Sequence, residues 1–342
     1  MARVGINPAR GKTTNRLPAR VTVAVLTYIP DLTGYFEHRL NILKLVLASL
    51  KAHTKPSHDI LIFDNGSCST VVDYLLELLN AGELDYLFLS QKNIGKIDSL
   101  RFIFNAAPGE IIAYSDDDIL FYPGWLEAHL QILNQFPRTG MVSGAPVRDA
   151  ARHARKSLEA LVDQGSPELR TTWERRIPDE WEMDWAISTG RDPKDHLQST
   201  KDLLDLVLHT PRSNDPASCE AIGSANHFQF VTPKSVILQA LPEEWTGKLM
   251  GSMIELDEAV DRLGYLRLST VDRYTRHLGN VLSDDELQQA QTLGLLSNIG
   301  FSEQTTAVTP RDSKKAHWLL RIPGSRRILS STYNRLFKIL YP

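Results

Sequence analysis

An alternation of apolar runs and helical segments restricts the fold of this chain more than any other feature. The β-branched run VTVAVLTY at 21–28 is followed by a segment at 35–54 whose leucines and valines recur at helical spacing. The alternation continues to a fourth apolar run, EIIAYS, at 110–115. Strands that alternate with helices form parallel sheets through right-handed crossovers. The sequence therefore predicts an α/β fold with a Rossmann-like parallel sheet flanked by helices.

Later segments extend this pattern after an interruption. The segment 146–215 is rich in charge, Trp and Pro, and we expect an insertion of helices and loops there. The residues predicted to form strands are 21–28, 58–65, 84–90, 110–115, 140–144, 226–233 and 265–270, and those predicted to form helices are 35–54, 70–82, 96–107, 124–137, 234–241 and 253–264.

Composition excludes several classes of protein. The formal net charge of -3 gives no reason to expect a nucleic-acid partner. The chain shows neither the apolar core of a secretory signal nor an apolar stretch of roughly 20 residues, so a cytoplasmic location is expected by default. The two cysteines, Cys68 and Cys219, are too few for a disulfide scaffold and are expected to be reduced thiols.

Three consecutive aspartates, Asp116, Asp117 and Asp118, directly follow the fourth apolar run. Open α/β sheets place their ligands at the carboxyl ends of their strands. Carboxylates one residue apart can share Mg²⁺ or Mn²⁺ there, with coordination positions left for phosphate oxygens. Alternatively, one aspartate caps the following turn while the others are solvated.

Two other turns follow predicted strands. In FDNGS, Asp64 and Asn65 end the second strand, where an acidic residue commonly contacts a ribose or base. In QKNIGK, Asn93, Gly95 and Lys96 precede a helix, where N–H groups and a cation suit a diphosphate. Each is also compatible with an ordinary turn.

The ordered occurrence of VAVLTY, FDNGS, KNIGK and YSDDDI at strand ends resembles the nucleotide-sugar half of GT-A fold glycosyltransferases, particularly family 2. The resemblance covers 21–145 and returns over 222–280. It implies a GT-A fold, with a mixed but mainly parallel sheet, divided into a nucleotide-sugar-binding half at 21–145 and an acceptor-binding half at 216–290. The resemblance does not cover the insertion at 146–215. Composition predicts a flexible basic arm at 1–20 and a basic amphipathic tail at 291–342.

The same resemblance implies roles for residues of the first half. Thr27 and Asp64 would contact the nucleoside, Asp116 the ribose side, and Asp117 would support its neighbours. The implied nucleotide-sugar site consists of Thr27, Tyr28, Asp64, Asn65, Asn93, Gly95, Lys96, Asp116 and Asp117. The Mn²⁺ or Mg²⁺ ion would be held by Asp118 and Asp116, with His277 completing its ligands, although His277 could equally be structural.

The second half should supply a base and the acceptor site. Inversion requires a carboxylate that takes a proton from the acceptor hydroxyl, and Asp257 is our first choice. Glu255 and Glu258 are rivals, because the three acids cannot all face one substrate from a helix. A solvated acidic face of the helix is the plainer interpretation.

Other residues fit an acceptor site. Trp245 could stack on a sugar, although tryptophans more often pack in cores, and Asn226 and His227 are candidate polar contacts. The basic and aromatic segment 313–342 could lie on anionic lipid, which would suit a lipid-linked acceptor and a peripheral position at the inner face of a membrane. A helix packed on the catalytic domain has the same pattern.

These features predict a metal-dependent inverting glycosyltransferase of the hexosyltransferase type, which moves a sugar from a nucleotide-diphosphate donor to a hydroxyl of a glycan or lipid-linked acceptor. A sugar nucleotidylyltransferase is an alternative, but it would need a Gly-rich phosphate loop after the first strand, where the chain reads LTYIPDLTGYFEHR. A non-catalytic module that binds nucleotide sugars or glycans is the other alternative.

Overall fold

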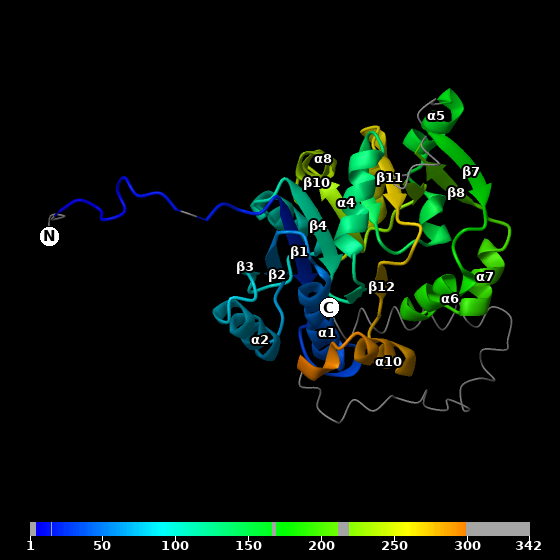
Figure 1. Cartoon of the computed structure of the whole chain (residues 1–342). Helices are drawn as coiled ribbons and strands as arrows, with labels where there is room; N and C mark the ends of the chain where they lie inside the picture. Colours follow the sequence, from blue (N-terminus) through cyan, green and yellow to red (C-terminus); the bar gives the residue numbers. More distant parts are fainter. Residues whose placement is uncertain (1–4, 15, 166–168, 211–218, 299–342) are drawn as a thin grey trace. The chain divides into compact units, whose positions relative to one another are not determined.

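A ten-stranded sheet forms the centre of the computed structural model, which describes residues 5–14, 16–165, 169–210 and 219–298 (Figure 1). The strands lie in the order β3-β2-β1-β4-β10-β6-β11-β9-β8-β7. Their bounds are β1 Val21–Thr27, β2 His58–Asp64, β3 Tyr86–Leu89, β4 Ile111–Asp116, β6 Thr139–Ser143, β7 Arg170–Glu174, β8 Asp205–His209, β9 Glu220–Ile222, β10 Gln229–Pro233 and β11 Leu266–Ser269.

The sheet is mixed, but most of its strands point the same way. β3, β2, β1 and β4 are mutually parallel, and β6 is parallel to β11. Only β10, β9 and β7 point in the opposite direction to the other strands of this sheet. The predicted fold class, a mainly parallel Rossmann-like sheet flanked by helices, is therefore confirmed.

Helices cover both faces of the sheet. Their bounds are α1 Arg39–His53, α2 Ser69–Asn80, α3 Lys96–Ala106, α4 Trp125–Gln135, α5 Lys156–Gln164, α6 Asp179–Ser188, α7 Pro193–Thr200, α8 Lys234–Ala240, α9 Met253–Arg262 and α10 Asp284–Thr292, with short 3₁₀ turns η1 Gly34–Phe36, η2 Arg148–Arg152 and η3 Leu296–Asn298. Apolar residues of α3, α8 and α9 form one core with β1, β2, β4 and β10. In Figure 1, α1 and α4 lie in front of the sheet.

A two-stranded sheet joins the two halves of the chain at the end of β4. Here β5 (Ile119–Phe121) pairs antiparallel with β12 (Thr275–His277), with His277 opposite Ile119. The N–H of Leu278 also donates to the carbonyl of Asp118 at 2.8 Å. This pairing places His277 beside the aspartates, in a short strand that lies beyond 265–270, the last strand predicted from the sequence.

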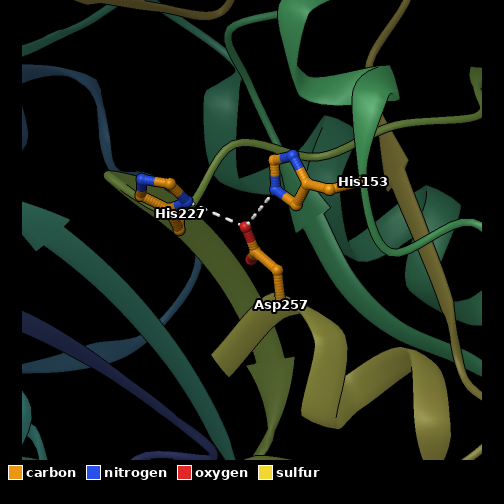
Figure 2. Close-up of side chains that lie close together, drawn as sticks. All are labelled: His153, His227 and Asp257. Carbon is orange, nitrogen blue, oxygen red and sulfur yellow. Dashed lines mark hydrogen bonds and ion pairs between the residues drawn. The ribbon is translucent and has the colours of Figure 1, made fainter. Parts of the chain in front are cut away.

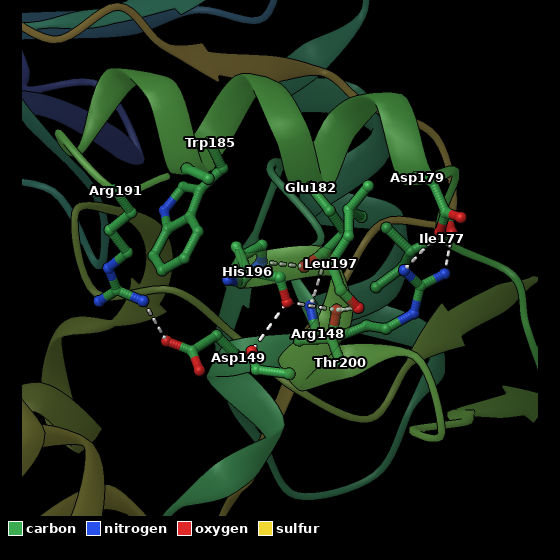
Figure 3. Close-up of polar contacts among 12 residues, drawn as sticks. Arg148, Asp149, Ile177, Asp179, Glu182, Trp185, Arg191, His196, Leu197 and Thr200 are labelled. Carbon is green, nitrogen blue, oxygen red and sulfur yellow. Dashed lines mark hydrogen bonds and ion pairs between the residues drawn. The ribbon is translucent and has the colours of Figure 1, made fainter. Parts of the chain in front are cut away.

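The insertion contributes both helices and strands. Its strands β8 and β7 extend the central sheet beyond β9, whereas only helices and loops were expected there. Its helices α6 and α7 enclose a buried polar cluster around Glu182 and His196 (Figure 3), in which the two side chains lie 2.6 Å apart. Arg148 enters the same cluster and is 1% exposed.

Other expectations concern the chain outside these elements. Cys68 and Cys219 are free thiols, as expected. None of the helices in the described ranges is both long and apolar enough to cross a bilayer. The predicted lipid-facing segment 313–342 lies outside the described residues.

Candidate active site

Three parallel strands end at one edge of the sheet and bring their last residues together. Thr27, at the end of β1, is in register with Asp64, at the end of β2. On the other side of β1, Leu26 is in register with Asp116, the last residue of β4. The motifs singled out in the first half of the sequence therefore meet at the edge where open α/β sheets bind ligands.

The three aspartates are stabilised by cations of the protein itself. Arg39 of α1 donates to Asp118 Oδ2 at 2.7 Å through Nη1 and to Asp117 Oδ1 through Nη2. The hydroxyl of Thr27 donates to Asp117 Oδ2 at 2.6 Å. Lys96 Nζ lies 2.7 Å from Asp116 Oδ2. The like charges that make the triplet unusual in sequence are thus offset by Arg39 and Lys96.

The two buried aspartates differ in their tendency to ionise. Burial raises the pKa of Asp117, although Arg39 acts in the opposite direction. Burial also opposes ionisation of Asp118, but the nearby His277 and Arg39 hold its pKa below the ordinary value. Asp118 is therefore the carboxylate of this buried pair that is kept charged.

Asp118 and His277 have the features of a metal-ligand pair. Asp118 Oδ1 and His277 Nδ1 are buried atoms with no hydrogen-bond partner. His277 Nε2 lies 3.6 Å from Asp118 Oδ2. Carboxylate oxygen and imidazole nitrogen are suitable ligands for Mn²⁺, so these residues fit the predicted ion. Asp116 fits less directly, since both its oxygens are engaged, by Lys96 Nζ at 2.7 Å and by the Tyr114 hydroxyl at 2.5 Å.

The two turns predicted to meet the nucleotide are joined to each other. Asn65 donates to Asn93 Oδ1 at 2.9 Å, and Asn93 Oδ1 also accepts from the N–H of Gly95 at 2.8 Å. Gly95 has φ +90°, and a Cβ there would lie 2.2 Å from the Lys248 carbonyl oxygen, so only glycine fits. The Asn93-to-Lys96 turn is therefore fixed against the turn that follows β2.

Asp64 and Tyr28, two further residues of the predicted nucleotide-sugar site, make contacts within the protein itself. Asp64 is 1% exposed and its carboxylate accepts from the N–H groups of Gly66 and Ser67 at 3.1–3.3 Å. Its oxygens thus stabilise their own turn, while burial raises its pKa. The ring of Tyr28 packs edge-to-face on Phe36, with centroids 6.0 Å apart.

Trp245 lies on a loop that covers the Gly95 turn. Its side chain is 57% exposed and packs on Phe102, with ring centroids 5.6 Å apart. The loop is fixed by Asp98, which accepts from the N–H groups of Thr246 and Gly247, each at 3.0 Å. Trp245 is thus a surface residue of this loop and not part of a core.

A second polar cluster centres on Asp257 of α9 (Figure 2). Asp257 Oδ2 lies 2.8 Å from His153 Nε2, 2.8 Å from His227 Nδ1 and 3.0 Å from Arg267 Nη2. Asp257 is fully buried, and although burial opposes ionisation, Arg267 and the histidines lower its pKa to about 2. Its Oδ1 has no hydrogen-bond partner.

The cluster of His153, His227 and Asp257 is the only trio of His, Cys, Asp or Glu in the described ranges whose potential metal-ligand atoms all lie within 4.8 Å of one another. The potential ligand atoms of the predicted trio, Asp116, Asp118 and His277, do not all lie within this distance of one another. However, the charge of Arg267 on the same Asp257 oxygen disfavours a cation in the histidine cluster.

The other predicted residues of the second half separate in space. Glu255 and Glu258 are exposed on α9, where Glu258 lies 3.8 Å from Arg262. Asn226 is buried and donates to the carbonyl of Ala145. Of the three acids proposed as base, only Asp257 faces the interior.

Sequence reasoning missed three residues of these clusters. Arg39 and His153 lie in segments without a motif, and only folding brings them to the aspartates and to Asp257. Arg267 did have a signal: it is a charged residue inside the short apolar run YLRLST, and such a residue needs a buried partner.

Comparisons with known proteins agree with the motifs. Residues 35–187 match the model for the family Glycosyl transferase family 2. No curated protein sequence matches the chain.

Several solved structures show limited similarity. S. aureus TarS 1-349 is 11% identical with a TM-score of 0.42, covering 83% of this chain and 67% of that one. The mannosyltransferase PcManGT from Pyrobaculum calidifontis, in complex with GDP-Man and Mn²⁺, is 19% identical with a TM-score of 0.33, covering 47% of this chain and 42% of that one. GalNAc-T7 with UDP, GalNAc and Mn²⁺ is 12% identical with a TM-score of 0.42, covering 76% and 44%. The family match agrees with the resemblance seen in the sequence: residues 35–187 of this chain are similar to glycosyl transferase family 2.

Proposed function

We propose that this protein is a metal-dependent inverting glycosyltransferase that transfers a sugar from a nucleotide-diphosphate donor to a hydroxyl acceptor, either a glycan or a lipid-linked molecule. One observation carries the proposal. In the segment that matches family 2, the aspartate triplet stands at the end of β4. Asp118 of this triplet is kept ionised, and its buried Oδ1 has no hydrogen-bond partner and lies beside His277.

Asp118 and His277, with Asp116 beside them, would hold Mn²⁺ or Mg²⁺. When bound, the ion supplies positive charge that offsets the charge of the leaving diphosphate. Arg39 and Lys96 keep the triplet compact in its absence, because each already neutralises a carboxylate. Lys96 also begins α3, so it adds a cation to the N–H groups of a helix terminus, where a diphosphate is favoured.

The donor site and the Asp257 cluster divide the reaction between them. The sheet edge from Thr27 to Asp118 would bind the nucleotide and orient the diphosphate. The cluster around Asp257, contributed by the second half and the insertion, would accept the proton of the attacking hydroxyl. Inversion follows when the hydroxyl attacks opposite the leaving diphosphate.

Donor binding tests this proposal directly. We expect UDP, GDP or another nucleoside diphosphate to raise the melting temperature only when Mn²⁺ or Mg²⁺ is present, because a ligand that binds the native state stabilises it. The Asp118→Asn variant should lose this shift. Asp59→Asn is a matched control, since Asp59 is also buried in a strand but lies at the opposite end of β2.

Three outcomes would contradict the proposal. The absence of any metal-dependent shift in melting temperature would exclude the proposed donor site. A shift without release of nucleoside diphosphate from any nucleotide sugar would indicate a binding module. Release of pyrophosphate from a nucleoside triphosphate and a sugar phosphate would indicate a nucleotidylyltransferase.

A further inference from the structure

We propose that His227 is the general base that removes the proton from the acceptor hydroxyl, and that Asp257 is a positioning residue that fixes the His227 ring. This assignment rests on the glycosyl transfer proposed above and names the proton acceptor within it. In this proposal His227, and not Asp257, is the group that contacts the substrate.

Asp257 itself is poorly placed to meet a substrate. Its side chain is fully buried, and its Oδ2 is shared among His153, His227 and Arg267. The pKa of about 2 makes this carboxylate a weak base at neutral pH. An approaching hydroxyl would have to displace at least one of these partners.

His227 has the opposite properties. Its Nδ1 lies 2.8 Å from Asp257 Oδ2, and an ionised carboxylate only accepts hydrogen bonds, so Nδ1 carries the proton. The lone pair is then on Nε2, on the far side of the ring. The side chain is 32% exposed, whereas that of Asp257 is completely buried. Figure 2 shows the Nδ1 side of the ring directed at Asp257.

The backbone places His227 next to the aspartate triplet. The following residue, Phe228, accepts a hydrogen bond from the N–H of Asp116 at 2.8 Å. Its ring packs edge-to-face on His277, with centroids 5.3 Å apart. His227 therefore lies in the bend directly before β10, and the next residue contacts both Asp116 and the candidate metal ligand His277.

His153 is the other histidine of the cluster and is better suited to support. It reaches Asp257 from the insertion through Nε2, and its side chain is 21% exposed. Its carbonyl lies 3.4 Å from Arg267 Nη1. Phe228 connects His227 to Asp116 and His277, whereas within the described part of the chain Arg152, the neighbour of His153, bonds to Asp149 and Ser199 instead. We therefore assign His153 the role of holding Asp257.

In the proposed step, the acceptor oxygen attacks the anomeric carbon and its proton moves to His227 Nε2. The bond between the anomeric carbon and the diphosphate oxygen breaks, and its electron pair stays on the diphosphate. The imidazolium that forms is stabilised by Asp257. The charged and titratable groups that face His227 in this cluster are Asp257, His153 and Arg267, and Arg267 is also within electrostatic reach of Asp261.

Two matched variants separate catalysis from support. His227→Asn keeps an amide N–H near the position of Nδ1 but has no Nε2. His153→Gln keeps one near the position of Nε2, which is the atom that contacts Asp257. The activity measured is release of nucleoside diphosphate from UDP-glucose, UDP-N-acetylglucosamine and GDP-mannose with Mn²⁺, with water as acceptor.

We expect His227→Asn to retain the metal-dependent thermal shift with UDP or GDP but to lose about 10²- to 10⁴-fold in kcat. His153→Gln should lose less than about tenfold, because only support is altered. Added imidazole should restore turnover to His227→Gly and not to Asp118→Asn. The acidic limb of the kcat pH profile should disappear in His227→Asn and persist in His153→Gln.

A spectroscopic measurement tests the geometry without turnover. In ¹⁵N-labelled protein, His227 should be the Nδ1–H tautomer, and Asp257→Asn should alter its ring nitrogen shifts more than those of His58. An Nε2–H tautomer of His227 in the wild type would overturn the assignment.

The possible failures are distinguishable. A wild type that shows neither metal-dependent nucleotide binding nor turnover would overturn the proposed function itself. Normal turnover in His227→Asn, with donor binding intact, would overturn the role of His227 alone. Zn²⁺ binding by the wild type that is lost in both histidine variants would identify the cluster as a metal site and would also overturn it.

Discussion

Glu182 and Asp257 are both fully buried carboxylates that contact histidine, yet their surroundings differ. Glu182 uses both oxygens: Oε1 accepts from the N–H of Arg148 at 2.7 Å, and Oε2 lies 2.6 Å from His196, which is itself buried (Figure 3). Asp257 leaves one oxygen without a partner, and its histidines reach the surface. A closed, satisfied pair stabilises the fold, whereas an open pair can exchange protons with a ligand.

The largest effect on stability should come from the closed pair. Glu182→Ala leaves the Arg148 N–H and the His196 ring without their acceptor in a buried site, and we expect the free energy of unfolding to fall by about 3–5 kcal/mol. Urea unfolding followed by circular dichroism measures this. Glu180→Ala, an exposed position of the same helix, should change it by less than about 0.5 kcal/mol. Similar losses at both positions would show that α6 is not held by the buried pair.

The contribution of Asp257 to stability should depend on pH. The pKa of Asp257 falls from its ordinary value of 3.8 to about 2 on folding, so its contribution is present above about pH 4 and is lost as the pH falls through 2. The shift corresponds to about 2 kcal/mol. The stability difference between wild type and Asp257→Asn should therefore shrink by about this amount between pH 5 and pH 2.

Urea unfolding at each pH provides this measurement. Glu255→Gln is the control from the same helix, and the difference between it and the wild type should not follow the same course, because Glu255 is exposed. A constant difference between wild type and Asp257→Asn across this range would show that Asp257 gains nothing from Arg267 and the histidines.

The sheet edge could be predicted from sequence because strand alternation is a local signal. Apolar runs ending at Thr27, Asp64 and Asp116 fix the strand ends, and parallel order then brings those ends together. The pairing of Lys96 with Asp116 follows from the same topology. Each of these residues stands within a motif whose position relative to a strand can be read along the chain.

The Asp257 cluster could be predicted only in part. Asp257 and His227 stand out as polar residues in the second half, but their contact joins positions 30 apart in sequence, and that with His153 joins positions 104 apart. No periodicity encodes such contacts. The edge strand β7 could not be predicted for another reason. Its residues are exposed or half-buried, so the apolar alternation of a covered strand is missing.

The smallest effect should come from the surface contacts beside the Glu182 cluster. Arg191 Nη1 donates to Asp149 Oδ2 at 2.9 Å and its guanidinium stacks on Trp185 at 4.3 Å, but half of the Arg191 side chain is exposed. Solvent screens such a pair, so Arg191→Ala should lower the free energy of unfolding by only about 0.5–1 kcal/mol. Arg191→Lys keeps the charge and should recover part of that loss. Raising the salt concentration should weaken the contribution of the ion pair further, whereas the loss in Glu182→Ala should stay constant because its partners are buried. A loss in Arg191→Ala that matched that of Glu182→Ala would mean that the surface contacts, and not the buried Glu182–His196 pair, hold the insertion together.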